Sequence, residues 1–298
     1  MNPMNPSNTQ ALYRGMDAAT LDRQYNARAS VASFEQEHQA YVRESERVMQ
    51  AHPGRLSVVY DERSGERLDL YGIAPGRPVF LWVHGGYWRG GSRLDNAFAA
   101  GGLCARGVAV AVMDYTLAPA VRIGEIVRQV RAAVAWLARQ APALGLRGER
   151  IHVGGSSAGG HLVGMLLADG WLQAAGLPAD TLGAALALSG LYELEPLQHT
   201  HINEWMRFTP AEIRDYSPQF HIPGQSTVRL IASVGGLETD EFRRQTAHYA
   251  QGWSDAGHAL QTVAMPEYNH FNIALSLSQA DGPLTQALLQ AIDVPATP

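Results

Sequence analysis

The sequence predicts an α/β fold, with a mostly parallel central sheet and helices on both of its faces. Short apolar segments rich in β-forming residues alternate with segments of helical periodicity over most of the 298 residues. Segments 78–84 (PVFLWVH) and 108–113 (VAVAVM) are apolar throughout, which is typical of strands buried on both faces. Residues 121–140 place their apolar side chains on one face of a helix.

The elements are expected in a simple order: two charged helices, a pair of strands, and then strands and helices in alternation. The expected helices are 18–28, 33–50, 121–140, 158–169, 240–252 and 283–292. The expected strands are 56–60, 67–72, 78–84, 108–113, 150–154, 183–189, 228–234 and 259–265.

Two stretches depart from this alternation. Residues 1–16 are rich in Asn and Pro, and we expect them to be poorly ordered. Residues 195–225 are polar and proline-rich, and we interpret them as a small lid-like insertion over the sheet. With no internal repeat, residues 17–298 are expected to form a single domain.

The composition is that of a soluble globular protein, with 46% hydrophobic and 17% charged residues. The 23 basic and 28 acidic side chains give a net charge of −5, and no basic stripe indicates a nucleic-acid partner. The N-terminus lacks the features of a signal peptide, and no apolar run is long enough to cross a bilayer. We therefore expect a cytoplasmic protein with neither a nucleic-acid nor a membrane partner. The single cysteine, Cys104, is interpreted as a packed small residue rather than a catalytic thiol.

A nucleophile is predicted at Ser157. Residues 155–159 (GSSAG) match Gly-x-Ser-x-Gly between a predicted strand and a predicted helix, which is the nucleophile elbow of the α/β-hydrolase fold. The flanking glycines allow the strand and the helix to approach closely. A phosphate-binding loop is the rival interpretation, but the motif lies in the middle of the chain and the lysine of a P-loop is missing.

Residues 84–88 (HGGYW) directly follow a predicted buried strand and predict an oxyanion loop. Backbone amides in a Gly-rich turn are suitable donors to the charge that develops on a carbonyl oxygen during acyl transfer. We expect the amides of Gly86, Tyr87 and Ala158 to form the oxyanion hole. We interpret His84 as a residue that shapes this loop through hydrogen bonds, rather than as the base.

His270 is the predicted base. In this fold the catalytic residues follow the chain order serine, acid, histidine. Among the downstream histidines, His248 falls inside a predicted helix, whereas His221 and His258 precede predicted strands. His270 lies just after the last predicted strand, at the carboxyl edge where parallel sheets place their sites.

The acid is predicted in the segment after the preceding strand, which offers Glu238, Asp240 and Glu241. Thr239 can cap the following helix, and acids in a first helical turn are favoured by the helix dipole. This explains Asp240 and Glu241 without any chemistry. Glu238 is therefore the predicted triad acid, and Asp240 is the alternative.

Further candidates flank these motifs. Tyr87, Trp88, Ser156 and His161 are candidate substrate-binding residues, although Tyr87 and Trp88 could equally pack beneath the pocket. In the insertion, residues 199–201 (HTH) contain two histidines but no obvious carboxylate partner, so we expect no metal site.

Taken together, the motifs resemble those of the arylformamidase (kynurenine formamidase) group, in the hormone-sensitive-lipase-like branch of the α/β-hydrolases. The likeness rests on LDRQYNARA (21–29), HGGYW (84–88), DYTLAP (114–119), GGSSAGGH (154–161), LETDEFRRQ (237–245) and NHF (269–271). By this resemblance the triad falls on Ser157, Glu238 and His270, and Asn272 stands where an acidic residue is common. The resemblance also implies N-formylkynurenine as the best-known substrate of the group and makes a homodimer a candidate assembly.

The predicted activity is therefore cofactor-free hydrolysis of a small aromatic amide or ester through an acyl-enzyme. Within the same mechanism, the alternative is a short-chain carboxylesterase. A hypothesis from another class is a catalytically inactive binding protein on the same fold. The presence of all three triad residue types at the expected places favours the enzyme.

Overall fold

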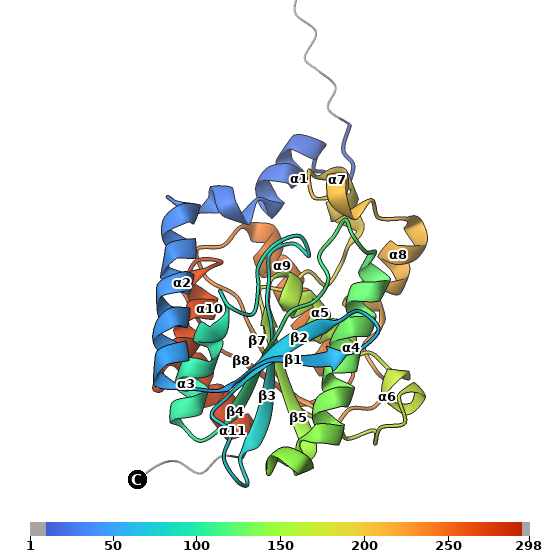
Figure 1. Ribbon diagram of the computed structural model, residues 1–298. Helices are drawn as coiled ribbons and strands as arrows, with labels where there is room; N and C mark the ends of the chain where they lie inside the picture. The colour runs from blue at the N-terminus through green and yellow to red at the C-terminus, as the bar shows by residue number, and fades with distance from the viewer. Residues whose placement is uncertain (1–9, 294–298) are drawn as a thin grey trace, which may run out of the picture.

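The computed structural model describes residues 10–293, which are built around a central sheet (Figure 1). Its strands are β1 (Arg55–Asp61), β2 (Glu66–Tyr71), β3 (Pro78–Val83), β4 (Ala109–Met113), β5 (Arg147–Ser156), β6 (Leu182–Leu188), β7 (Arg229–Ser233) and β8 (Leu260–Thr262). They lie in the order β1-β2-β4-β3-β5-β6-β7-β8. β2 runs antiparallel to β1 and β4, and every pairing from β4 to β8 is parallel. The prediction of a mostly parallel sheet is confirmed.

Helices cover both faces of this sheet, as predicted. One face is covered by α4 (Ile123–Gln140), α5 (Ala158–Leu166) and α9 (Asp240–Asp255). The other is covered by α2 (Phe34–Ala51), α3 (Ala100–Ala105), α10 (Asn272–Leu275) and α11 (Pro283–Ala291). In Figure 1, α2 and α3 lie on one side of the strands and α4 on the other. Within residues 10–293, no helix is both long and apolar enough to cross a membrane.

The strand β3 shows how the sheet serves two cores. Val79, Leu81 and Val83 are fully buried against the face of α4 and α5, whereas Phe80 and Trp82 are fully buried against the face of α2 and α3. Successive side chains of a strand point to opposite faces, so a strand covered on both sides must be apolar at every position. This explains the continuous apolar run in the sequence.

The helix α3 was not among the predicted elements, because its segment AGGLCA combines two glycines with small residues. The structure shows why glycines are used here. A Cβ added at Gly102 would lie 2.6 Å from the carbonyl oxygens of Leu277 and Gln279. The helix therefore packs directly on the backbone that follows α10, and this close contact outweighs the low helix propensity of glycine.

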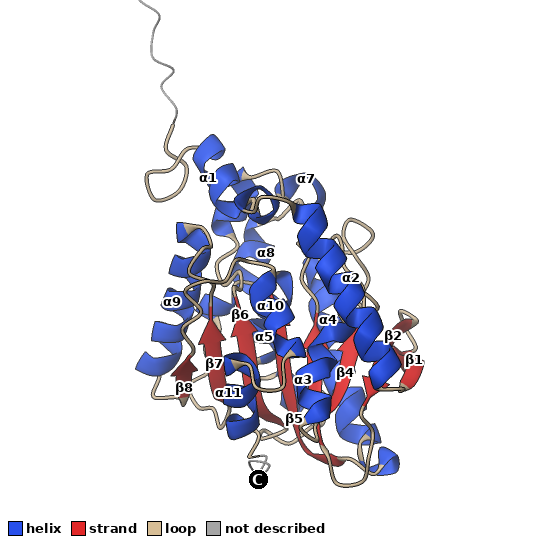
Figure 2. Cartoon of the chain, turned by 90° about the vertical axis from the view of Figure 1, so that its left-hand side faces the viewer, coloured by secondary structure: helices blue, strands red, loops and turns tan. Residues whose placement is uncertain are grey.

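Above the carboxyl ends of the strands, two segments distant in sequence lie side by side. These are α1 (Ala18–Tyr25), near the N-terminus, and α7 (Asn203–Met206), within the insertion (Figure 2). The insertion also contains α8 (Pro210–Asp215) and follows α6 (Trp171–Ala174) and β6. Of the segment expected to be poorly ordered, residues 1–9 lie outside the described residues. In the remainder, the Tyr13 hydroxyl donates to Glu193 at 2.7 Å.

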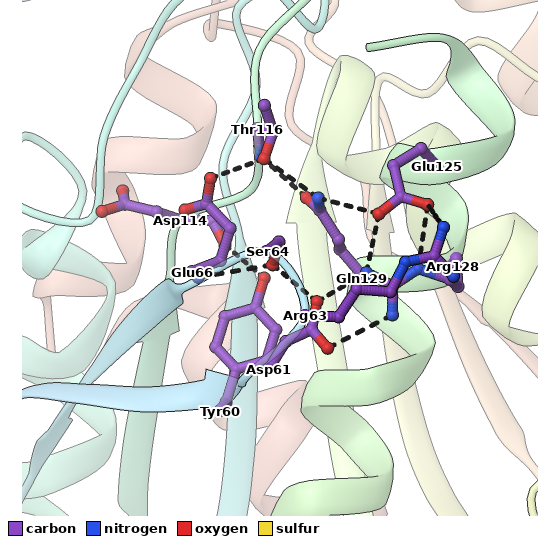
Figure 3. A network of polar contacts seen from close by, with 10 residues as sticks. All are labelled: Tyr60, Asp61, Arg63, Ser64, Glu66, Asp114, Thr116, Glu125, Arg128 and Gln129. Atoms are coloured by element: carbon purple, nitrogen blue, oxygen red, sulfur yellow. Dashed lines mark hydrogen bonds and ion pairs between the residues drawn. The ribbon is translucent and has the colours of Figure 1, made fainter.

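A polar network ties the antiparallel edge of the sheet to α4 (Figure 3). Arg128 of α4 bridges Asp61 of β1 at 2.5 Å and Glu125 of its own helix at 2.7 Å. In the same network, Thr116 donates through its hydroxyl to Glu66 of β2 at 2.6 Å and accepts from the side chain of Gln129 at 2.9 Å. The network thus fixes the segment that follows β4, and this segment supports the candidate site described next.

Candidate active site

Ser157 occupies a sharp turn between β5 and α5. Its backbone is at φ 59° and ψ −120°, a region that non-glycine residues adopt only under strain. Its amide donates to the carbonyl of Leu188 at the end of β6 at 2.9 Å, which holds the turn in place. A Cβ added at Gly159 would lie 2.0 Å from the Val83 carbonyl oxygen, so only glycine allows α5 to pass this close to β3. The geometry is that of a nucleophile elbow.

Glu238 and His270 form a buried pair at the carboxyl ends of β7 and β8. The His270 Nδ1 donates to the Glu238 carboxylate at 2.6 Å, and both side chains are buried. Because Nδ1 carries this proton, the lone pair of a neutral His270 ring lies on Nε2. Nε2 is therefore the atom that can accept a proton.

The Glu238 carboxylate is fixed by two further donors. The Ser189 hydroxyl donates to it at 2.5 Å and the Gly235 amide donates at 2.7 Å. Ser189 lies just beyond β6 and is fully buried, with a backbone at φ +47°. Sequence reasoning missed Ser189. The signal available was a polar residue directly after the apolar strand GAALALS, at the carboxyl edge that carries the other site residues.

The alternative acid, Asp240, lies elsewhere. Its side chain is 75% exposed and pairs with Arg243 one turn further along α9. Glu241 accepts hydrogen bonds from Tyr25 and Arg244. Of the three acids considered from the sequence, only Glu238 contacts His270.

The loop after β3 turns sharply at Gly86 and Tyr87, with φ values of +100° and +50°. A Cβ added at Gly86 would lie 2.3 Å from the Gly90 carbonyl oxygen, which explains the glycine. Within the described part of the chain, the amides of Gly86 and Tyr87 donate to no protein acceptor. The amide of Ala158, in the first turn of α5, has no intrahelical acceptor. The loop lies next to Ser157, since a Cβ added at Gly85 would lie 3.2 Å from the Ser157 Cβ. Three amides without an acceptor among the described residues are therefore available near this serine.

His84 supports this loop from inside. Its Nδ1 donates to the Gly85 carbonyl at 2.8 Å, and its ring stacks on Tyr115 with centroids 4.3 Å apart. The Tyr115 hydroxyl donates to the His84 carbonyl at 3.1 Å. Burial lowers the pKa of His84, so the ring stays neutral. Tyr115 belongs to the segment that the polar network of Figure 3 anchors.

Ser157 and His270 open into one cavity of about 640 Å³. Its floor consists of Gly85, Gly86, Ser156, Ser157 and His270, and Tyr87, Arg89, Asp95 and Asn96 line its sides. Its roof consists of two segments, which contribute Asn26, Ala27, Arg28, Phe34, His38 and Tyr41 from the N-terminal region and His201 and Trp205 from the insertion. We call these eight residues the roof. The aromatic rings of Phe34, Tyr41, Tyr87, Trp205 and Phe271 give the cavity much of its wall.

The four candidate substrate-binding residues divide into two pairs. Tyr87 and Ser156 line the cavity. Trp88 and His161 do not, which corrects the prediction for these two residues: both are fully buried, and their rings meet edge to face at 5.0 Å. Trp88 has φ +56°, which turns its side chain beneath the loop, and His161 donates through Nε2 to the Tyr216 carbonyl at 2.7 Å. Both residues pack under the site.

The N-terminal part of the roof was not predicted from the sequence. Residues 18–28 and 33–50 were expected to form helices, and nothing in their pattern indicated a cavity wall. From the insertion, His201 and Trp205 line the cavity. His201 pairs with Asp22 of α1 at 2.6 Å, and no cluster of three or more candidate metal ligands occurs in residues 10–293.

Comparison with known proteins identifies the family of this chain. The BD-FAE family model matches residues 68–172, which span the strands and motifs from β2 to α6. A kynurenine formamidase from Salmo salar is 30% identical over 292 residues, covering 93% of this chain and 97% of the relative.

Solved structures show the same fold. The crystal structure of a candidate thioesterase from Silicibacter is 27% identical, with a TM-score of 0.76 over 89% of this chain and 97% of that one. A hyperthermophilic esterase from Pyrobaculum calidifontis is 18% identical and superposes with a TM-score of 0.70 over 93% of this chain and 98% of that one. The predicted α/β-hydrolase fold is confirmed, and the chain is a hydrolase of the serine-hydrolase type. It belongs to the kynurenine formamidase family, the arylformamidase-like group that the sequence motifs resemble.

Proposed function

We propose that this protein hydrolyses a small aromatic amide, an aryl formamide in the first place, with Ser157, His270 and Glu238 as its catalytic triad. The observation that carries the proposal is the buried Glu238–His270 pair, 2.6 Å apart, which opens into the same cavity as the strained Ser157. A histidine oriented by a carboxylate beside an exposed serine hydroxyl is the arrangement that serine hydrolases use.

In the proposed first step, the Ser157 hydroxyl oxygen attacks the carbonyl carbon and its proton passes to Nε2 of His270. Glu238 stabilises the imidazolium that forms, and its own fixed hydrogen bonds keep the ring in the reactive orientation. The carbonyl oxygen gains the electron pair of the π bond. It is stabilised by the amides of Gly86, Tyr87 and Ala158, which are already oriented before the reaction starts.

The tetrahedral intermediate then collapses. The bond between carbon and nitrogen breaks, His270 gives its proton to the leaving aryl amine, and the acyl group stays on Ser157 as an ester. Water, deprotonated by His270, attacks this ester and releases the carboxylic acid, which is formate when the substrate is a formamide. The hydroxyl of Ser157 is restored by the proton that returns from His270.

Two observations support an aromatic amide as the substrate. Five aromatic rings contribute to the cavity wall, and an aromatic substrate can pack against them in stacked or edge-to-face arrangements. The chain also covers nearly the whole length of its Salmo salar relative, which bears the name kynurenine formamidase. A cavity of about 640 Å³ lies in the usual range for small-molecule sites and accommodates one substituted aromatic ring with a side chain.

The test compares N-formylkynurenine with p-nitrophenyl acetate and p-nitrophenyl butyrate as substrates. We expect the highest kcat/KM on the formamide, and a loss of about 10⁶-fold in kcat for Ser157→Ala. Ser254→Ala, at an exposed position of α9, is the matched control and should keep full activity. Higher kcat/KM on the esters would favour a carboxylesterase. Near-normal turnover by Ser157→Ala would refute the mechanism, and failure of a fluorophosphonate probe to label Ser157 would favour a binding protein.

A further inference from the structure

Tyr87 is held from two sides by segments that lie outside the sheet. Its hydroxyl donates to the backbone carbonyl of Tyr25, at the end of α1. Its own carbonyl accepts a hydrogen bond of 3.1 Å from the indole Nε1 of Trp205, in α7. These partners lie 62 and 118 positions away in the sequence, one before and one after Tyr87. Both the side chain and the carbonyl of this residue are thus fixed, and only its amide is left for a ligand.

The first of these partners is firmly anchored. The Tyr25 side chain is fully buried, and its hydroxyl donates to Glu241 at 2.7 Å and accepts from the Gln245 side chain at 2.7 Å. The preceding carbonyl, that of Gln24, accepts from the Thr239 hydroxyl at 2.6 Å. The end of α1 is therefore fixed to the segment that begins α9, directly after Glu238.

The second partner is anchored too, and by residues from both sides of the cavity. The guanidinium of Arg89 lies over the Trp205 ring at 4.7 Å, and the His201 ring meets it at 5.6 Å. His201 is in turn fixed to α1, because its amide and its Nδ1 both bond to the Asp22 carboxylate, at 2.7 and 2.6 Å. Trp205 is thus tied to the oxyanion loop through Tyr87 and Arg89, and to α1 through His201.

These contacts matter because the Tyr87 backbone is strained. A tyrosine at φ +50° lies in the left-handed region that non-glycine side chains disfavour, and the neighbouring Gly86 makes the loop intrinsically flexible. A strained conformation persists only where the surroundings over-determine it. The loop is closed on either side of Tyr87 by the Gly90 amide, which donates to the Gly86 carbonyl at 3.0 Å, and by the Ala118 amide, which donates to the Trp88 carbonyl at 2.7 Å. The two hydrogen bonds from outside the sheet are the ones that act on Tyr87 itself.

We propose that Trp205 and the end of α1 at Tyr25 position the Tyr87 amide in the oxyanion hole. They are positioning groups rather than catalytic ones, because neither contacts the reacting atoms. The inference rests on the proposed function and deepens it: the roof that shapes the cavity also completes the transition-state site. It follows that loss of either hydrogen bond weakens binding of the oxyanion more than binding of the substrate.

The test uses Trp205→Phe, which removes the N–H and keeps a ring against Arg89, and Tyr87→Phe, which removes the hydroxyl. Each is measured for kcat, for KM and for inhibition by 2,2,2-trifluoroacetophenone. With this ketone, the Ser157 oxygen adds to the carbonyl carbon, its proton passes to His270, and the carbonyl oxygen becomes an oxyanion. The inhibitor therefore reports on the oxyanion hole, whereas KM reports on the remainder of the cavity.

We expect each variant to lower kcat about 5- to 20-fold and to raise the inhibition constant of the ketone by a similar factor, with KM within about twofold of the wild-type value. Losing an oxyanion donor outright costs more than this, about 10²- to 10³-fold, so the expected effect corresponds to a loosened donor. Trp136→Phe, at a half-buried position on α4, is the matched control and should leave all three quantities unchanged.

Two outcomes would overturn the inference. A raised KM with unchanged kcat and unchanged ketone inhibition would make Trp205 a wall of the cavity only. Unchanged values in both variants would mean that the loop holds itself. If one variant fails to fold, as judged by its thermal midpoint, the other still decides. The proposed function fails separately, if the wild-type protein hydrolyses none of the amide and ester substrates.

Discussion

The site is made of two regions built in different ways. The floor arises from the sheet: Ser157 and His270, together with Glu238 behind His270, each follow the carboxyl end of a strand, so the topology brings them together. The roof arises from the segment that follows α1, from the first half of α2 and from His201 and Trp205 of the insertion, all of which lie outside the sheet. The positions of the three proposed triad residues are thus set by the sheet, whereas the shape of the cavity depends on segments outside the sheet.

The two regions also differ in burial. Glu238 and His270 are each only 4% exposed. Both oxygens of the Glu238 carboxylate accept hydrogen bonds, one from Ser189 and Gly235 and the other from His270. In the roof, Arg28 is exposed and lies over the Phe34 ring, and the Trp205 ring is covered by Arg89 from the side of the cavity. Substitutions in the floor should therefore act on kcat, and those in the roof on KM, apart from the two groups that hold Tyr87.

The largest expected effect is in the floor. Glu238→Gln should lower kcat by about 10³- to 10⁴-fold. The neutral amide cannot stabilise the imidazolium, and with its oxygen held by Ser189 and Gly235 its NH2 group faces Nδ1, which favours the tautomer without a lone pair on Nε2. Steady-state kinetics on the preferred substrate measures this. Asp240→Asn is the matched control, since that carboxylate is exposed and pairs with Arg243, and it should stay within about twofold of the wild type. Equal losses in both variants would break the distinction between the two acids.

The next effect is on the free energy of unfolding at acid pH, which should differ between the two regions. Burial lowers the pKa of His161, under the floor, to about 4, so the unfolded chain binds a proton there before the folded one does. Stability is then lost as the pH falls from the ordinary histidine pKa toward 4. Between about pH 7 and pH 5 this amounts to on the order of 2 kcal/mol in the free energy of unfolding. His161→Phe should flatten that part of the curve in urea denaturation, and an unchanged curve would contradict this assignment.

At Asp22, which holds His201 of the roof, stability is also lost as the pH falls, but in a lower pH range. Burial acts to raise the pKa of Asp22, but the hydrogen bonds from the amide and side chain of His201 outweigh it and lower the pKa below its usual value. The stability that this carboxylate contributes is present above its unfolded pKa and is lost only as the pH falls through the lower folded value. The roof contact at Asp22 should therefore survive the pH range in which His161 destabilises the floor. Amide exchange of α1 at about pH 5 checks this.

A smaller effect is expected from the roof side chains that face the substrate. Phe34 lines the cavity and packs against Phe271 with ring centroids 5.3 Å apart. Phe34→Ala should raise KM for an aromatic substrate about fivefold and leave kcat nearly unchanged, because the lost contact acts on substrate and transition state alike. Phe220→Ala, which removes a ring that is 57% exposed, serves as the control. A fall in kcat with constant KM would place Phe34 in the catalytic machinery instead.

The smallest effect is expected at Cys104, which belongs to neither region. The thiol is buried in α3, and burial raises its pKa to about 12, so it is neither exposed nor ionised at neutral pH. Cys104→Ala should keep full activity, and iodoacetamide should leave the native enzyme active. Inactivation by the reagent, with protection by substrate, would contradict this assignment.

The floor could be predicted from the sequence because its signals are local. The turn at Ser157 needs two flanking glycines, and the loop at Gly86 needs another. These glycines can be recognised in the sequence as motifs. Glu238 was chosen over Asp240 because a helix cap explained the latter, and the structure places only Glu238 against His270.

The roof could not be predicted, because its contacts join residues far apart in the chain and use ordinary residue types. Neither Trp205 nor Phe34 belongs to a motif, and the carbonyl of Tyr25 carries no signal in any sequence. Trp88 and His161 were placed in the pocket because they adjoin the motifs, but side-chain direction at these two positions depends on backbone angles that adjacency does not reveal.

The separation in sequence between the partners of α1 has a consequence for how the protein is made. The hydroxyl of Tyr25 meets Glu241 across 216 positions, and the Gln24 carbonyl meets Thr239 across 215. The helix is synthesised more than 200 residues before these partners. Contacts of such long range form late in folding. The contact between Tyr87 and the end of α1 therefore gains its anchor only after the segment that begins α9 has been synthesised.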